Sequence, residues 1–126
     1  MASIRLRQEY FGKRTELPTL CGRTVILVDD GLASGFTMEA AVQSVRGQGA
    51  ERVLIAVPTS SRSAYIRLKP QVDNIVCPDV SPPGMFAVAN AYETWYDVSE
   101  DDALNILENF SQTVTSRGPG NGDTTN

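Results

Sequence analysis

Three short hydrophobic segments, separated by two amphipathic ones, set the pattern between residues 25 and 77. Residues 25–28 (V-I-L-V) and 53–57 (V-L-I-A-V) are continuous apolar runs, typical of strands that are buried on both faces. Residues 72–77 form a third, shorter segment that stops before Pro78. The pattern therefore predicts three strands, at residues 25–28, 53–57 and 72–77.

The stretches between these strands have helical spacing. The first has apolar residues three and four positions apart, at Met38, Ala41, Val42 and Val45, and it should end near Gly47 and Gly49. The second should begin at a serine cap, Ser60 or Ser61, run through Leu68 and end at Pro70. Each predicted helix thus connects two predicted strands.

This alternation of strands and helices predicts an α/β fold with a parallel sheet of at least three strands and flanking helices, joined by right-handed crossovers. Strands in simple sequential order place both crossover helices on one side of the sheet. The opposite face, and one edge of the 25–28 strand, then need cover from the N-terminal segment, the last helix or a second subunit. We therefore expect a homodimer or a partner subunit.

The C-terminal third begins with an aromatic group, for which core packing is favoured over stacking on a nucleobase: Phe86, Tyr92, Trp95 and Tyr96. Ser99 and Asp102 resemble a capping box that opens a further helix. From Ser111 the sequence turns to Ser, Thr, Gly, Asn and Pro, a composition typical of disorder. The expected organisation is one partial domain over residues 1–110 and a disordered tail over residues 111–126.

Composition and charge exclude several classes of function. Eleven Lys and Arg against fifteen Asp and Glu give a net charge of -4, and the basic residues are scattered, so no nucleic-acid partner is expected. The chain has no histidine, which excludes a Ser-His-Asp hydrolase. No apolar run is long enough to cross a membrane and no signal peptide is visible, so a cytoplasmic protein without a membrane partner is expected.

The junction between the first strand and the first helix has the composition of a ligand site. Its sequence is V-I-L-V-D-D-G-L-A-S-G-F-T, residues 25–37. Loops at the carboxyl ends of parallel strands are where open α/β sheets bind ligands, and small residues before a helix N-terminus let backbone N–H groups approach an anion. Asp29 and Asp30 would repel that anion, and suit hydroxyl groups or a divalent cation instead. A sugar phosphate such as ribose 5-phosphate, with a diol at one end, satisfies both requirements.

This segment resembles the ribose-phosphate motif of type I phosphoribosyltransferases. The resemblance implies a three-layer α/β domain that binds phosphoribosyl diphosphate with Mg²⁺ and transfers phosphoribose to a nitrogenous acceptor. It also implies that the catalytic residues Asp29 and Asp30 hold the ribose diol. The 5′-phosphate would be held by the loop formed by Ala33, Ser34, Gly35, Phe36 and Thr37. The magnesium ion would arrive with the diphosphate rather than bind to protein ligands of its own.

The resemblance covers roughly residues 20–110, similar to the second half of predicted phosphoribosyltransferases of undefined substrate, and two positions depart from the family pattern. Ala33 stands where enzymes for six-oxopurines carry an acid, which argues against that substrate. Phe36 occupies a position that is usually small in the family. Its N–H remains usable, but its ring is expected to cover the phosphate.

The family also places a pyrophosphate-binding loop on an earlier strand, and the residues before the 25–28 strand contain none. A non-catalytic module that binds phosphoribosyl diphosphate or a nucleotide, or an incomplete domain that needs a partner, is therefore the alternative. A phosphoacceptor receiver domain, whose first strand also ends in acids, lacks support because no suitable Lys follows Asp79.

Overall fold

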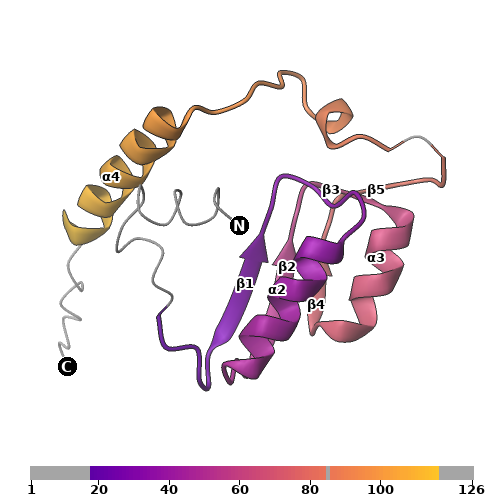
Figure 1. The fold of residues 1–126 in the computed structure, drawn as a ribbon, viewed down its shortest axis with the longest axis horizontal. Helices are drawn as coiled ribbons and strands as arrows, with labels where there is room; N and C mark the ends of the chain where they lie inside the picture. The colour runs from indigo at the N-terminus through magenta and orange to yellow at the C-terminus, as the bar shows by residue number, and fades with distance from the viewer. Residues whose placement is uncertain (1–17, 85, 117–126) are drawn as a thin grey trace, which may run out of the picture. The chain divides into compact units, whose positions relative to one another are not determined.

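The computed structural model describes residues 18–84 and 86–116 (Figure 1). The chain divides into two compact units, whose described parts are residues 18–95 and 96–116. The first unit contains all the strands and the predicted ligand loop, and the second contains one long helix.

A three-stranded parallel sheet forms the centre of the first unit. Its strands are β1 (Thr24–Val28), β2 (Arg52–Ala56) and β4 (Asn74–Val76), in the order β1-β2-β4. The register pairs Leu27 with Ile55 and Ile55 with Ile75. The predicted α/β class, with three parallel strands in sequential order and flanking helices, is confirmed, and the strand bounds differ from the predicted ones by at most two residues at either end.

Two of the three strands, β2 and β4, are each followed by a proline and then by a further short strand. β3 (Thr59–Ser61) follows Pro58, β5 (Asp79–Ser81) follows Pro78, and β3 and β5 pair in parallel with Thr59 opposite Asp79. Proline has no N–H to donate to a ladder, so both strands are interrupted at the same level of the sheet. A parallel bridge between Leu32 and Ser60 places the chain after β1 beside β3. Leu32, β3 and β5 thus form an upper tier beyond the prolines, and β1, β2 and β4 form the lower tier.

Helices pack on one face of the sheet. α2 (Phe36–Gly47) buries Met38, Val42 and Val45, as its spacing predicts. α3 (Arg62–Leu68), followed by the short 3₁₀ turn η2 (Lys69–Gln71), buries Ala64 and Leu68. The predicted cap is confirmed at Ser61, whose hydroxyl accepts the Ala64 N–H at 3.2 Å. These helices enclose the core against the fully buried Val53 and Ile55 of the central strand.

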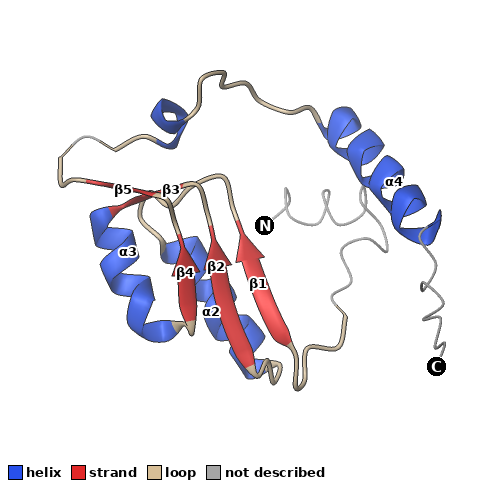
Figure 2. Cartoon of the chain, turned by 180° about the vertical axis from the view of Figure 1, so that it is seen from behind, coloured by secondary structure: helices blue, strands red, loops and turns tan. Residues whose placement is uncertain are grey.

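The opposite face of the sheet has no described cover within this unit, as Figure 2 shows from that side. Ile26, Val28 and Val76 point to this face and are 58%, 74% and 56% exposed. The expectation that residues 25–28 are buried on both faces is therefore wrong for the described unit. The reason is topological: with strands in sequential order, both helices lie on the same side, and β1 alternates between exposed and partly buried residues.

Beyond β5 the first unit ends in a loop with one 3₁₀ turn, η3 (Val88–Ala91). The aromatic side chains that follow η3 do not enter the core: Tyr92 and Trp95, at the end of the first unit, are 36% and 46% exposed, and Tyr96, at the start of the second, is 72% exposed. The prediction that this group packs in the core is wrong for these three residues. Tyr92 and Trp95 instead contact each other edge to face at the surface.

The second unit contains α4 (Glu100–Ser116). Its predicted start is confirmed, since the Ser99 hydroxyl accepts the Asp102 N–H at 3.1 Å and donates to the Asp102 carboxylate at 2.7 Å. The helix continues to Ser116, beyond residue 111, at which the tail was expected to begin, and residues 117–126 of that expected tail lie outside the described residues. The apolar residues Ile106, Leu107 and Phe110 are exposed.

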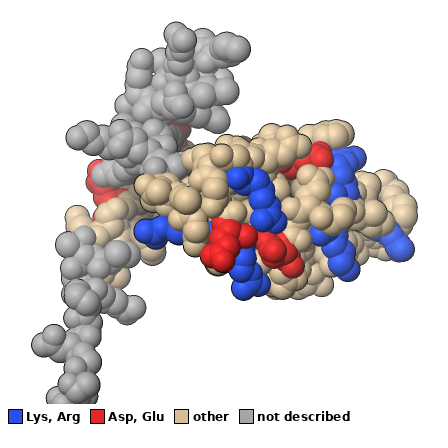
Figure 3. All heavy atoms as spheres, turned by 90° about the horizontal axis from the view of Figure 1, so that it is seen from below, with Lys and Arg blue, Asp and Glu red and all other residues tan. Residues whose placement is uncertain are grey.

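Charge on the molecule is mixed in sign. The face seen from below in Figure 3 shows Lys and Arg side chains next to Asp and Glu side chains, without a continuous patch of one sign on the part that grey atoms leave visible. Over the described residues, no helix combines the length and the apolar composition that a membrane span requires.

We expect Asp73→Asn to lower the melting temperature at neutral pH. The Asp73 carboxylate accepts the Val53 N–H at 2.7 Å and the Arg46 guanidinium at 3.0 Å, which ties the start of β2 to the end of α2. The Val53 N–H, followed by Arg46, holds the pKa of Asp73 below its ordinary value. Stability from such a group is present above the unfolded pKa and is lost as pH falls through the folded pKa, so the variant should converge on wild type only at pH values below the lowered pKa of the folded protein.

Thermal melts at several pH values test this expectation. Asp97→Asn is the control, because Asp97 has no described hydrogen-bond or ion-pair partner, and it should melt as the wild type does. Equal melting temperatures for wild type and Asp73→Asn at pH 7 would show that the contact contributes nothing.

The open sheet face should be an association surface. Removing apolar surface from water contributes roughly 25 cal/mol of free energy per Å², so an exposed apolar face favours the binding of a second copy or of a partner subunit. We expect Ile26→Lys, in the middle of the edge strand β1, to reduce self-association measured by sedimentation at micromolar concentration. Phe110→Lys, on the separate apolar stripe of α4, is the comparison. A wild-type protein that is monomeric throughout would contradict association through copies of this chain.

Candidate sugar-phosphate site

The predicted ligand loop leaves β1 at Asp29 and enters α2 at Phe36. Gly35 caps the helix in the left-handed conformation, with φ of 78°. A Cβ atom at this position would lie 3.0 Å from the Cβ of Ala64 and 3.3 Å from a methyl group of Leu68. The loop therefore turns into α2 while packed directly on α3, and only glycine fits both the backbone angle and the space.

Backbone N–H groups gather at this turn. In the described part of the chain, no acceptor is found for the N–H groups of Ala33, Ser34, Gly35, Thr37 and Met38. These residues line a cavity of about 190 Å³ together with Asp29, Gly31 and Leu32. Unpaired N–H groups at a helix N-terminus, with the positive end of the helix dipole behind them, form a binding site for an anion.

The loop carbonyl groups are held on the other side by α3 and β3. The Ser61 hydroxyl donates to the Ala33 carbonyl at 2.5 Å, and the Arg67 guanidinium donates to the Ser34 carbonyl at 2.5 Å. With these two carbonyls bound, their peptide groups are fixed in orientation. Neither residue was predicted for this role, and Ser61 was expected only as a helix cap.

The side chain of Phe36 lies away from the anion site. Its ring is 63% exposed, and the Arg67 guanidinium stacks over it, 4.2 Å from the ring centroid. Phe36 does not line the cavity, whereas its four predicted partners in the loop do. The departure from the family pattern at this position is thus accommodated by a cation–π contact with α3, and the ring does not cover the cavity.

Asp29 and Asp30 both lie at the surface, directly after β1. The Asp29 carboxylate accepts the Asp30 N–H at 2.9 Å, and Asp29 lines the cavity while Asp30 lies just outside its lining. Partial desolvation, followed by the charge of Asp29, raises the pKa of Asp30 above its ordinary value. The structure therefore brings one acid into the anion cavity, and the other adjoins it in sequence.

Comparison with known proteins agrees with this geometry. The sequence pattern of the phosphoribosyl transferase domain matches residues 3–87. The chain belongs to the phosphoribosyl transferase domain family.

Relatives of this phosphoribosyl transferase domain are longer than the chain. Two strains of Mycobacterium tuberculosis, CDC 1551 and H37Rv, each have a protein named "Putative phosphoribosyl transferase", 30% identical over 94% of this chain. The chain spans about a quarter of the length of these relatives, 26%. The crystal structure of TT1426 from Thermus thermophilus is 37% identical, with a TM-score of 0.68 over 80% of this chain and 47% of its own.

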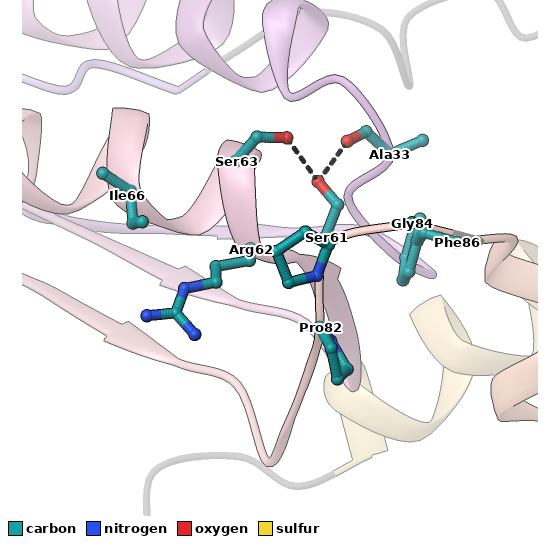
Figure 4. Close-up of a pocket in the computed structure, with 9 residues that line it drawn as sticks. Ala33, Ser61, Arg62, Ser63, Ile66, Pro82, Gly84 and Phe86 are labelled. Carbon is teal, nitrogen blue, oxygen red and sulfur yellow. Dashed lines mark hydrogen bonds between the residues drawn. The ribbon is translucent and has the colours of Figure 1, made fainter.

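A second cavity of about 570 Å³ lies beside the loop of this phosphoribosyl transferase domain (Figure 4). Its walls are the start of α3, the loop after β5 and Ala33. The figure shows the Ser61 hydroxyl between the Ala33 carbonyl and the Ser63 hydroxyl, while the Arg62 side chain extends along the opening. The two cavities therefore share Ala33, and the bond from Ser61 fixes the wall between them.

Three further polar residues lie at this end of the sheet: Thr59, Ser60 and Asp79. Thr59 and Ser60 are fully buried, and the Thr59 hydroxyl donates to the Asp79 carboxylate at 2.7 Å. Asp79 thus braces β3 against β5 rather than lining the anion cavity.

We expect Gly35→Ala to destabilise the domain by on the order of 1–2 kcal/mol, because a left-handed backbone is unfavourable for alanine and the added methyl group meets Ala64. Gly47→Ala is the matched control: its Cβ would meet nothing within 4 Å, and alanine in a helix is favoured over glycine by about 1 kcal/mol. Urea denaturation of both variants measures the difference. Equal stability of Gly35→Ala and wild type would show that the loop is not constrained at this turn.

Proposed function

We propose that this domain binds phosphoribosyl diphosphate through its ribose 5-phosphate part and transfers phosphoribose to a nitrogenous acceptor, with Mg²⁺ bound to the diphosphate. One observation carries the proposal: the unpaired N–H groups of the 33–38 turn and the carboxylate of Asp29 line the same cavity. An anion site next to a carboxylate suits a ligand that is negative at one end and offers hydroxyl groups at the other.

The phosphate end of the ligand has N–H donors and hydroxyl groups available. Ala33, Ser34, Gly35 and Thr37 line the cavity through small side chains, and the hydroxyls of Ser34 and Thr37 add donors. Phe36 takes part through its N–H alone, which at present has only a long contact, 3.4 Å, with the Ser34 hydroxyl. The phosphate would replace water on these donors and gain charge-assisted hydrogen bonds.

The diol end faces the two acids. Asp29 and Asp30, when ionised, accept hydrogen bonds from the 2′- and 3′-hydroxyls. A sugar held at both ends has its C1 atom fixed in position, which lowers the entropic cost of the reaction. Two carboxylates beneath the ring also stabilise the positive charge that develops on an oxocarbenium-like sugar as pyrophosphate leaves.

The magnesium ion fits this scheme as part of the substrate. Over the residues that the structure describes, no group of three or more Cys, Asp or Glu side chains is placed to hold a metal. In this proposal the two acids bind the hydroxyl groups, and the ion neutralises the diphosphate when that ligand binds.

A binding module without turnover is the second candidate. No Lys or Arg side chain is among the described residues that line the sugar-phosphate cavity, so these residues offer the leaving pyrophosphate no cationic partner. This observation favours binding of phosphoribosyl diphosphate or a nucleotide by the chain alone, with transfer requiring groups from outside the described residues.

Titration calorimetry with ribose 5-phosphate, and with phosphoribosyl diphosphate plus Mg²⁺, tests the proposal. Asp30→Asn should weaken the binding of both ligands by about 10- to 100-fold, the effect of losing a charge-assisted hydrogen bond. Asp97→Asn should bind as wild type does. Release of pyrophosphate with a panel of nitrogenous bases then separates the transferase from the binding module. The sugar-phosphate site is refuted if wild type and Asp30→Asn bind ribose 5-phosphate equally.

A further inference from the structure

A segment remote in sequence packs on the peptide that follows the two acids. The Tyr92 hydroxyl donates to the main-chain carbonyl of Asp30 at 2.6 Å. Val88 lies against Gly31, where an added Cβ would come within 2.7 Å of a Val88 methyl group, and the Thr59 methyl group lies 3.0 Å from the same point. The Asp30–Gly31 peptide is thus enclosed by side chains from η3 and β3.

Tyr92 is itself held in place. Its N–H donates to the Ala89 carbonyl at 3.2 Å, which closes the turn of η3. Its ring meets the Trp95 ring edge to face, with centroids 5.3 Å apart. The hydroxyl is therefore presented to Asp30 by a turn and an aromatic pair, which fix the direction of the ring.

We propose that Tyr92 is a positioning residue for the ribose-binding acids: by holding the carbonyl of the Asp30–Gly31 peptide, it sets the direction of the Asp30 carboxylate toward the sugar diol. Tyr92 acts through Asp30 and has no contact with the phosphate end of the site. This inference rests on the proposed function, because it assigns a role within the same sugar site.

The electrostatics of Asp30 agree with this role. The N–H of Gly31 belongs to the peptide that Tyr92 holds, and it acts on the Asp30 carboxyl to lower its pKa, against the larger effects of desolvation and of Asp29. Among the described residues, Asp29 on the loop and Tyr92, directly after η3, are the titratable groups that bond to this peptide. Release of the carbonyl would let the peptide rotate and would weaken the contribution of the Gly31 N–H.

Tyr92→Phe tests the proposal, since it removes the hydroxyl and keeps the ring. We expect calorimetry to show ribose 5-phosphate binding weakened on the order of 3- to 10-fold, the effect of one hydrogen bond, with binding of inorganic phosphate unchanged. Tyr96→Phe is the matched control: its side chain is 72% exposed and has no described partner, and it should leave both affinities unchanged.

Carbon-13 NMR titration of the Asp30 carboxyl provides a readout that does not need a ligand. The pKa of Asp30 should rise in Tyr92→Phe and stay constant in Tyr96→Phe. If Tyr92→Phe weakens ribose 5-phosphate and phosphate equally, or leaves both the ribose 5-phosphate affinity and the Asp30 pKa unchanged, the positioning role is overturned. If wild type binds no ribose 5-phosphate, the proposed function fails, and the NMR titration alone decides whether Tyr92 positions Asp30.

Discussion

Unsatisfied backbone N–H groups at the β1–α2 junction are the constraint on which the rest of this structure depends. A helix must leave its first N–H groups without intrahelical partners, and here the loop before α2 adds further N–H groups from Ala33, Ser34 and Gly35. Water can satisfy these groups, but an anion satisfies them with a gain in electrostatic energy. Gly35, in the left-handed conformation, lies where the loop carrying these groups enters α2.

The same turn is stabilised by residues of β3 and α3 that do not line the sugar-phosphate cavity. Ser61 and Arg67 bind the loop carbonyls, and Leu68 packs beneath Gly35. The two sides of the loop therefore differ. One side presents N–H groups to the sugar-phosphate cavity, and the other side is held by hydrogen bonds from Ser61 and Arg67. A preorganised backbone of this kind binds a ligand without the entropic cost of ordering a flexible loop.

Local sequence features predicted much of the fold and of the site. The apolar runs specified β1 and β2, the 3- and 4-residue spacing specified α2, and Ser61 and Ser99 specified two helix starts, since each of these signals acts over a few neighbouring residues. The exposure of Ile26 and Val28 was mispredicted, because a run of apolar residues does not reveal whether both faces of a sheet are covered. Arg67 and Tyr92 were missed because their partners are distant in sequence, at Ser34 and Asp30, and only the folded topology brings them together.

The paired prolines at 58 and 78 divide the sheet into a lower tier that carries the hydrophobic core and an upper tier that carries the polar residues of the ligand end. The ladder hydrogen bonds of each tier are largely separate. A change of side chain in β3 or β5 therefore removes no hydrogen bond from the β1-β2-β4 ladder, which carries the apolar core.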